Sequence, residues 1–533
     1  MIQHHQTRAE RARMPLVRDV IRVAAVDHGV CIRPIPVRRV DLATGEATAV
    51  DLPCGATLAA KCPSCAERAR RLRLAQCREG WHLEAEPILD PDPATTEQRQ
   101  LATARADLER ARAETEAASE DTTEVDQVIE QVDQALHEAG TRGRILTHTR
   151  VRRVRSTRRR QDAPDLPRRR VQPTTVGRVY AGRFRPSLFV TCTLDSYGPV
   201  RADGTPVDPD RYDYRRAARD AVHFGRLVDR FIQNLRRFVG WEVQYFAAVE
   251  PQRRLAPHLH LAMRGTAPRA DLRRVAAATY HQAWWPACEE PVYTDDEFPP
   301  EWDPDRECYL DPETGEPLPT WDDALDRLDQ DSDARPVHVA RFGAQVDAQG
   351  VLAGSPDAAR CLGYLAKYLT KSIPECHTPN TDEEREHAAR LLDALRYEPC
   401  SARCANWLRY GVQPKPAKAG MRPGCCRGKA HRPEHLGYAG RRVLVSRKWS
   451  GKTLGDHRAD RRAWVLRLLG DTDEQRDPGR YAWEPITTGD PDLRPLPRRL
   501  LLALAERARW RTALDEAKRR AGLDPPDCSA TAA

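Results

Sequence analysis

Hydrophobic positions concentrate in the middle of the chain, where they predict a series of strands and helices. The segment 187–194 (SLFVTCTL) is apolar and rich in β-branched residues, which is typical of a buried strand. The segments 242–250 and 258–264 are the next strand candidates and are joined by a short turn. The segment 220–240 spaces its apolar residues at helical intervals, so that they form one stripe. We therefore expect an α+β domain that begins near residue 176.

Further elements are expected in the same domain. The segment 267–285 has helical periodicity, and 336–342 (PVHVARF) is a strand candidate. Another helix is expected at 355–373, where Ser355 is a good N-cap and Pro356 suits the first helical position. These elements would complete the α+β domain.

The composition changes several times along the chain, and we place domain boundaries at these changes. The expected parts are an N-terminal Cys-rich module at 1–90, a helical segment and Arg-rich linker at 91–175, the α+β domain at 176–375, a basic Cys/His region at 376–460 and a helical tail at 461–533. Residues 95–140 predict one or two exposed helices with charge pairs four residues apart. Residues 288–334 are acidic and Pro-rich, which indicates an insertion on the surface of the α+β domain.

Charge and cysteine content narrow the class of protein. The 533 residues include 86 Lys or Arg and 78 Asp or Glu, and the net charge of +8 favours a polyanionic partner. The excess of arginine over lysine is equally consistent with a GC-rich genome. No apolar run approaches the roughly 18 residues that cross a bilayer, and the start resembles no secretory signal, so we expect a cytoplasmic protein with no membrane partner. In that compartment, 15 cysteines indicate thiols or metal ligands rather than disulfides.

Two histidines one residue apart distinguish the strand expected at 258–264. Residues i and i+2 of a strand project from the same face, so His258 and His260 point together. The preceding strand ends at Glu250, and an antiparallel turn would bring this carboxylate beside the two imidazoles. Such a group leaves positions open on a divalent ion for water or a phosphate oxygen. The pattern also fits an iron site, or a pair in which one histidine is bonded in the core and the other is solvated.

The helix expected at 355–373 has two tyrosines on its polar face. At about 100° per residue, one sector contains Leu362, Leu365, Leu369 and Ile373. The opposite side contains Tyr364, Lys367, Tyr368 and Lys371. A phenolate that attacks a phosphodiester would leave a phosphotyrosine ester and a free 3′-hydroxyl, and the lysines would steady the phosphate or assist the leaving group. An ordinary amphipathic helix whose Tyr and Lys side chains face solvent explains the pattern equally well.

Together the two stretches resemble the HUH endonucleases, in particular the rolling-circle replication initiators of actinomycete plasmids and integrative elements. The three family motifs are matched in order by the strand LFVTCTLD, the triplet His258-Leu259-His260 and the run from Tyr364 to Lys371. The stretches CANWLRYGVQPK, KAHRPEHLGYAGRRVLVSRKWSGKTL and CPSCAE are also similar to these initiators. The long acidic insertion between the second and third motifs departs from the family pattern.

The resemblance implies a fold, a metal and an activity. The fold would be a ferredoxin-like or RRM-like HUH core, with an antiparallel sheet that carries the histidines and a tyrosine helix packed nearby. Mg²⁺ or Mn²⁺ would be held by His258 and His260, with Glu250 as the third ligand. Tyr364 and Tyr368 would be the nucleophiles, and the sequence does not rank them. The activity would be nicking of one strand at a plasmid origin through a 5′-phosphotyrosine link, followed by rejoining at termination.

The expected partners are origin DNA, either single-stranded or supercoiled duplex, and host replication proteins. No P-loop of the form GxxxxGK[ST] is present, so unwinding would require a host helicase, and synthesis a host polymerase. The stretch 446–454 (SRKWSGKTL) contains Gly-Lys-Thr but lacks the first glycine of that pattern. We interpret this stretch as basic sequence that faces DNA.

Two groups of cysteines have spacings that suit Zn²⁺. Cys62 and Cys65 have zinc-knuckle spacing, with Cys54 and Cys77 on either side. The second group comprises Cys400, Cys404, Cys425 and His431, in a stretch that offers further ligands. Zinc at either place would be structural and would fold a short basic module able to hold DNA. Reduced structural cysteines are the alternative for each group.

Two other kinds of function remain open. A conjugative relaxase or a two-tyrosine transposase would keep the nuclease chemistry, although relaxases typically have three clustered histidines and a tyrosine near the N-terminus. A non-catalytic zinc-containing DNA-binding regulator would bind DNA without a covalent product. It would leave the Tyr/Lys helix unexplained.

Overall fold

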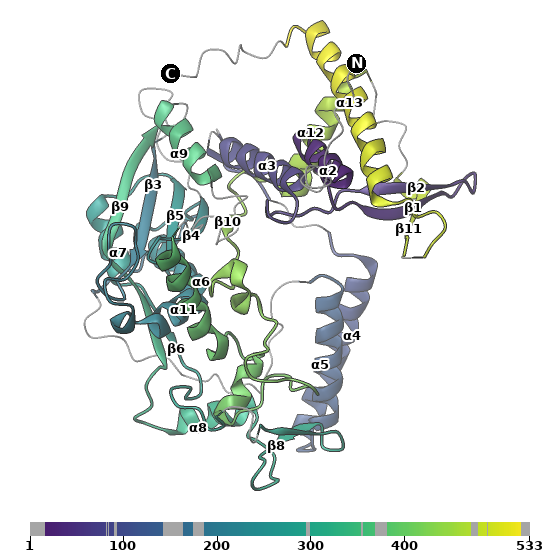
Figure 1. Cartoon of the computed structure of the whole chain (residues 1–533). Helices are drawn as coiled ribbons and strands as arrows, with labels where there is room; N and C mark the ends of the chain where they lie inside the picture. Colours follow the sequence, from purple (N-terminus) through teal and green to yellow (C-terminus); the bar gives the residue numbers. More distant parts are fainter. Residues whose placement is uncertain are drawn as a thin grey trace, which may run out of the picture. The chain divides into compact units, whose positions relative to one another are not determined.

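The computed structural model describes residues 16–81, 83, 85–89, 93–141, 164–173, 186–294, 299–352, 355–367, 381–470, 478–487 and 489–523. The chain divides into two compact units (Figure 1). The larger unit combines Met1–Pro87 with Arg159–Ala533, and the smaller unit is Ile88–Arg158. Helices and antiparallel sheets occur together in the larger unit, which confirms the expected α+β class.

A six-stranded antiparallel sheet lies at the centre of the larger unit (Figure 1). Its strands are β3 (Pro186–Leu194), β4 (Tyr245–Pro251), β5 (Pro257–Arg264), β6 (Tyr280–Ala283), β9 (His338–Leu352) and β10 (Val443–Val445). The spatial order is β10-β4-β5-β3-β9-β6. Glu250 of β4 lies opposite His258 of β5, and Thr191 of β3 lies opposite His260. All four strands expected from the sequence therefore belong to one sheet.

Two helices, α6 (Tyr214–Val239) and α7 (Arg269–Ala277), pack on the first face of this sheet. A third helix, α11 (Asp382–Tyr397), packs on α6. Helix α6 begins at Asp213, whose carboxylate accepts the N–H of Arg216, and ends at Gly240 in the left-handed conformation. Leu227 and Phe231 of α6 are fully buried in the same core as Leu259 and Leu261 of β5. Each such side chain stabilises the fold by about 1.5–3 kcal/mol relative to exposure.

The second face of the sheet carries the two histidines and is partly covered by α3 (Pro63–Trp81) and α9 (Pro356–Lys367). Leu362 and Leu365 of α9 are buried with Phe246 of β4, as the helical periodicity predicts. The Ser355 hydroxyl accepts the N–H of Ala358 at 3.2 Å, which confirms the expected cap.

Two segments differ from the sequence expectation. Residues 267–285 form α7 and then the edge strand β6, because Tyr280–Ala283 pairs with β9 instead of continuing the helix. The acidic insertion contains β7 (Glu301–Asp303), β8 (Cys308–Leu310) and α8 (Trp321–Gln330). It is not confined to the surface, since Tyr309 is 2% exposed and Trp321 is 7% exposed. The ring of Trp321 lies 4.9 Å from that of Trp407, so the insertion and the Cys/His region share a core.

Segments near both ends of the chain form a further part of the larger unit. A three-stranded sheet has the order β11-β1-β2 and consists of β1 (Ile35–Asp41), β2 (Ala47–Leu52) and β11 (Tyr481–Pro485). The helices here are α2 (Val17–Asp27), α12 (Leu454–Leu468) and α13 (Leu496–Arg520). Ala25 and Val30 are buried against Leu500 of α13. The Cys-rich module and the tail, which we separated in the sequence, therefore pack together.

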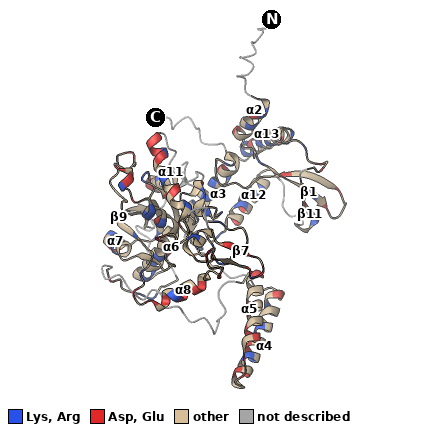
Figure 2. Ribbon diagram, turned by 60° about the horizontal axis from the view of Figure 1, so that its bottom comes forward, with Lys and Arg blue, Asp and Glu red and all other residues tan. Residues whose placement is uncertain are grey.

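The smaller unit is a pair of helices, α4 (Thr96–Ala117) and α5 (Thr123–Glu138). Thr95 and Gln98 form a capping box at the start of α4. Arg105 is buried and pairs with Asp133 at 2.9 Å and Glu109 at 2.6 Å. Basic and acidic residues both occur along these helices (Figure 2). Within the described ranges of either unit, no helix is long and apolar enough to cross a membrane.

Candidate functional site

Glu250, His258 and His260 meet on the second face of the six-stranded sheet. Glu250 Oε1 lies 2.6 Å from Nε2 of each histidine, and the two Nε2 atoms are 3.0 Å apart. All three side chains are buried. Strand alternation points both histidines to one face, and the antiparallel pairing of β4 with β5 brings the carboxylate to them. The structure thus brings together the three residues expected as metal ligands.

Burial and mutual hydrogen bonds set the protonation of this group. Burial lowers the pKa of His258, and this effect exceeds the opposite effect of its hydrogen bond with Glu250. Burial raises the pKa of Glu250, but the hydrogen bonds of His258 and His260 outweigh it, so this pKa lies below its ordinary value. Neutral imidazoles and an ionised carboxylate are the forms that coordinate a divalent cation.

The donors in this group suit one divalent cation. One ligand atom from each residue lies within 4.8 Å of the others. Among the described residues, Glu250 Oε2 and His258 Nδ1 are buried without a hydrogen-bond partner. Thr191 Oγ1 lies 3.0 Å from His260 Nδ1, and this contact leaves Nε2 facing Glu250. The chemistry and convergence of the donors therefore fit a cation site.

Tyr364 of α9 reaches the same group. Its hydroxyl lies 3.4 Å from Nε2 of His260, and the two ring centroids are 4.9 Å apart. Phe189 of β3 supports both rings, since it stacks on His260 at 5.9 Å and meets Tyr364 edge-on at 6.1 Å. Tyr364 is 39% exposed, in contrast to the buried histidines beside it.

The other residues expected on the tyrosine helix are described only in part. Lys367 is the last residue of α9, and its side chain lies outside the described residues. Tyr368 and Lys371 also lie outside them. The geometry thus places one of the two tyrosines at the site and does not rank the pair.

A pocket of about 280 Å³ is lined in part by Phe189, whose ring stacks on that of His260. Its lining includes Thr191 and Asp347 from the sheet and Arg269 and Arg273 from α7. Two guanidinium groups beside a cation site suit a phosphate, because arginine matches phosphate oxygens in charge and shape. The sequence did not reveal these residues, since only strand pairing brings β9 next to β3.

The first sulfur group consists of Cys31, Cys54, Cys62 and Cys65, whose ligand atoms lie within 4.8 Å of one another. The closest Sγ pairs are Cys54 with Cys65 at 3.7 Å and Cys31 with Cys62 at 3.8 Å. Cys77, which we expected as a ligand, lies elsewhere. It is 1% exposed in the core beside Trp449, about three helical turns beyond Cys65 on α3. The loop before β1 supplies Cys31 instead.

The second sulfur group consists of Cys400, Cys404, Cys426 and His431. His431 Nε2 lies 3.4 Å from Cys404 Sγ, and its Nδ1 is 3.0 Å from the carbonyl oxygen of Leu395. Hydrogen bonds from Cys400 and Cys404 lower the pKa of Cys426, which favours a thiolate there. Cys425 is exposed and outside the group, which corrects our expectation. Of the two adjacent cysteines, only Cys426 faces the other ligands.

Trp449 anchors the stretch 446–454 in the fold, while Arg447 and Lys452 are exposed, so a role of this stretch in facing DNA stays a prediction. Trp449 is fully buried and meets Trp81 edge-on at 6.2 Å. Lys452 Nζ pairs with Glu79 at 2.8 Å, and Thr453 caps α12. The Gly-Lys-Thr residues therefore serve as a helix start.

The fold and the site define a mixed α+β protein in which an antiparallel sheet holds a histidine–carboxylate group beside a tyrosine. A family model described as the replication initiator protein of pSAM2 matches residues 18–506. The chain therefore belongs to this family of replication initiators, which confirms the resemblance seen in the sequence. A replication initiator protein from Streptomyces ambofaciens is 26% identical over an alignment of 281 residues that covers 43% of this chain and 52% of that relative. The chain thus spans about half the length of this relative, and no solved structure matches.

Proposed function

We propose that this chain initiates rolling-circle replication of a plasmid by nicking one strand of origin DNA with a tyrosine. Membership of the initiator family supports the role in replication. The observation that carries the chemistry is the position of the Tyr364 hydroxyl, 3.4 Å from Nε2 of His260. In this proposal the six-stranded sheet is the HUH core.

The proposed step is a transfer of a phosphoryl group to tyrosine. The phenolate oxygen of Tyr364 attacks phosphorus, the bond to the 3′-oxygen breaks, and that oxygen takes a proton and leaves as a free hydroxyl. The 5′-phosphate stays on the tyrosine, so the reverse attack rejoins the strands. Mg²⁺ or Mn²⁺ held by Glu250, His258 and His260 would supply polarisation of a non-bridging phosphate oxygen.

The side chains around the tyrosine have distinct tasks in this proposal. Phe189 holds the rings of Tyr364 and His260 in place, and Arg269 and Arg273 bind a phosphate of the strand. Tyr368 would be the second nucleophile, and Lys367 and Lys371 would steady the phosphate or assist the leaving group. Origin DNA is the proposed partner, with a host helicase and polymerase for unwinding and synthesis.

We also propose structural Zn²⁺ at both sulfur groups. Each group supplies four donors within 4.8 Å, which is the ligand number of a closed, tetrahedral zinc site. The surrounding segments are short and irregular, and metal ligation would supply folding free energy that their small cores lack. These zinc ions would organise the chain and would take no part in the chemistry.

Covalent capture tests the nicking activity. The full chain is mixed with a labelled single strand of the origin, with Mn²⁺ or with EDTA, and resolved on a denaturing gel. A Mn²⁺-dependent protein–DNA adduct is expected, and His258→Ala should abolish it. Tyr364→Phe and Tyr368→Phe, compared separately, assign the initiating nucleophile. Tyr481→Phe in β11 is the matched control and should retain the adduct.

Two outcomes would change the conclusion. DNA binding without any adduct would favour a non-catalytic DNA-binding regulator. An adduct that persists in the double variant, Tyr364→Phe with Tyr368→Phe, would show that another residue is the nucleophile.

A further inference from the structure

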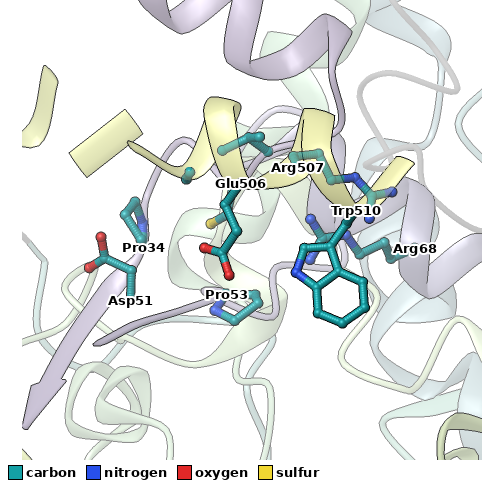
Figure 3. A pocket seen from close by; sticks show the side chains of 10 residues that line it. Pro34, Asp51, Pro53, Arg68, Glu506, Arg507 and Trp510 are labelled. Atoms are coloured by element: carbon teal, nitrogen blue, oxygen red, sulfur yellow. The ribbon is translucent and has the colours of Figure 1, made fainter. Parts of the chain in front are cut away.

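A second pocket, of about 160 Å³, lies between the Cys31 group and α13 (Figure 3). Its lining includes Cys31, Asp51, Arg68, Glu506, Arg507 and Trp510. The indole of Trp510 lies beside the guanidinium groups of Arg68 and Arg507 (Figure 3). This pocket shares no lining residue with the site around Tyr364.

Arginines from three helices converge at this pocket. Arg68 and Arg71 of α3, Arg461 of α12 and Arg511 of α13 are close enough to act on Arg507. Desolvation lowers the pKa of Arg507, and these neighbouring positive charges lower it further. All five arginines are exposed. Such a concentration of like charge is stabilised when an anion binds between the guanidinium groups.

Acidic side chains compensate only part of this charge, since Arg71 pairs with Glu67 at 2.8 Å and Glu506 stands on the wall of the pocket. Within the described ranges, the ion pairs of α13 join Arg499 to Asp51 and Lys518 to Asp515, and none includes Arg507 or Arg511. Asp51 at the pocket is therefore already neutralised by Arg499. Glu506 remains as a hydrogen-bond acceptor on the wall.

Trp510 adds an aromatic surface to the charged pocket. It is 47% exposed although indole is usually among the more buried side chains. A half-exposed tryptophan beside arginines is typical of sites where a base stacks on the ring and its phosphates meet the cations. In a duplex, stacking within the helix hides the faces of the bases, so this combination fits an unpaired nucleotide better than double-stranded DNA.

We propose that this pocket binds an unpaired nucleotide of single-stranded DNA, with the base on Trp510 and the flanking phosphates at Arg68, Arg507 and Arg511. Glu506 would accept a hydrogen bond from the base. The choice of DNA as the polyanion rests on the proposed function. The residues of the pocket by themselves suit any anion that carries an aromatic ring. The bound nucleotide would differ from the one attacked by the tyrosine.

Fluorescence anisotropy with the full chain tests this site. The probes are a labelled single strand of about 12 nucleotides and the matching duplex, from about 50 to 200 mM NaCl. Trp510→Ala should weaken single-strand binding roughly 5- to 100-fold, with duplex binding unchanged, because one base loses its stacking partner. Trp510→Phe should restore most of the affinity.

The matched controls lie on the same helix. Arg507→Ala with Arg511→Ala should weaken single-strand binding and make it less dependent on salt. Arg519→Ala with Arg520→Ala removes equal charge from exposed positions at the end of α13 and should change the affinity much less. Equal losses in the two double variants, or unchanged single-strand binding by Trp510→Ala, would overturn the proposal.

The outcome for this pocket is separable from the nicking activity. A short oligonucleotide that spans only the nick site should form the tyrosine adduct equally with wild type and Trp510→Ala. If no variant forms an adduct, the nicking proposal fails, while the loss of single-strand affinity in Trp510→Ala still supports the nucleotide site.

Discussion

At the residue scale, Thr191 controls the orientation of His260. In the tautomer of His260 that offers Nε2 as a metal ligand, Nδ1 carries the proton. This N–H donates a hydrogen bond to Thr191 Oγ1, at 3.0 Å. Partners of this kind fix the ring and the tautomer of a coordinating histidine. The Thr191 side chain therefore affects cation binding through His260, without contacting the ion.

Thr191→Val should lower the affinity for Mn²⁺ about 10- to 100-fold, because the ring of His260 loses its hydrogen-bond partner. Isothermal titration calorimetry with Mn²⁺ measures this effect directly. Thr191→Ser keeps the hydroxyl and should bind like wild type. Equal affinities for Thr191→Val and wild type would exclude an orienting role.

Two adjacent arginines on α7 provide a test of the pocket beside the tyrosine. Arg273 lines that pocket, whereas Arg274 donates to the carbonyl oxygen of Asp165 at 2.6 Å. In Arg273→Ala, half-maximal formation of the covalent adduct should require an about tenfold higher DNA concentration than in wild type, because one charge-assisted contact to phosphate is lost. Arg274→Ala removes the same charge and should have little effect. The measurement is a titration of the labelled strand at fixed protein concentration.

The sequence identified some functional residues and not others for physical reasons. Strand alternation suffices to align His258 with His260, and a single turn brings Glu250 to them. Cys31 escaped notice because it precedes Cys54 by 23 residues, outside any zinc-knuckle spacing, and only folding brings it there. Phe189 was not identified from the sequence, because its contacts with His260 and Tyr364 depend on the packing of α9 over β3.

At the element scale, a histidine cluster around the buried His223 joins α6 to the edge of the sheet. The ring of His223 on α6 lies 5.4 Å from that of His281 on β6 and 5.8 Å from that of His338 on β9. Burial lowers the pKa of His223 to about 2 and that of His281 to about 4. Both imidazoles therefore stay neutral in the folded protein at pH values where an unfolded chain takes up protons.

This difference predicts that acid destabilises the larger unit. Below the ordinary histidine pKa of about 6.5, His223 and His281 take up protons in the unfolded state but stay neutral in the folded state. The free energy of unfolding therefore decreases as the pH is lowered. The loss is about 2 kcal/mol per histidine between about pH 7 and pH 5. Urea unfolding at pH 7 and pH 5 measures this decrease in the free energy of unfolding, which should be about 2 kcal/mol smaller in His223→Phe than in wild type.

The elements that the sequence predicted best are those fixed by their own periodicity. The stripe of α6 and the alternation of β5 appear where expected, because their burial depends on one continuous face. The edge strand β6 was missed since four residues, YHQA, have no distinctive pattern and take strand form through pairing with β9. Similarly, the acidic insertion buries Trp321 only because the distant Trp407 is there to meet it.

At the scale of the whole molecule, the two sulfur groups predict the metal content of the chain. Elemental analysis of the purified protein should find two Zn²⁺ per chain, since each group offers four donors. Cys31→Ala and Cys426→Ala should each remove about one zinc ion. Cys77→Ala and Cys425→Ala should remove none, because these side chains lie outside the groups. Retention of both ions in Cys31→Ala would contradict the proposed ligand set.

Composition did not reveal how the parts of the larger unit are connected. The N-terminal module and the C-terminal tail form one sheet and one core. Contacts between such distant segments leave no local pattern in the sequence, because each strand alone has an ordinary composition.

The pairing of β1 with β11 has a consequence for biosynthesis. Arg39 lies opposite Trp483, so β1 emerges from the ribosome long before its neighbour is translated. Until Tyr481–Pro485 has been made, one edge of β1 lacks its pairing strand. A product that stops between residues 372 and 480, through a frameshift or a premature stop codon, would contain the histidines and tyrosines but not the completed three-stranded sheet.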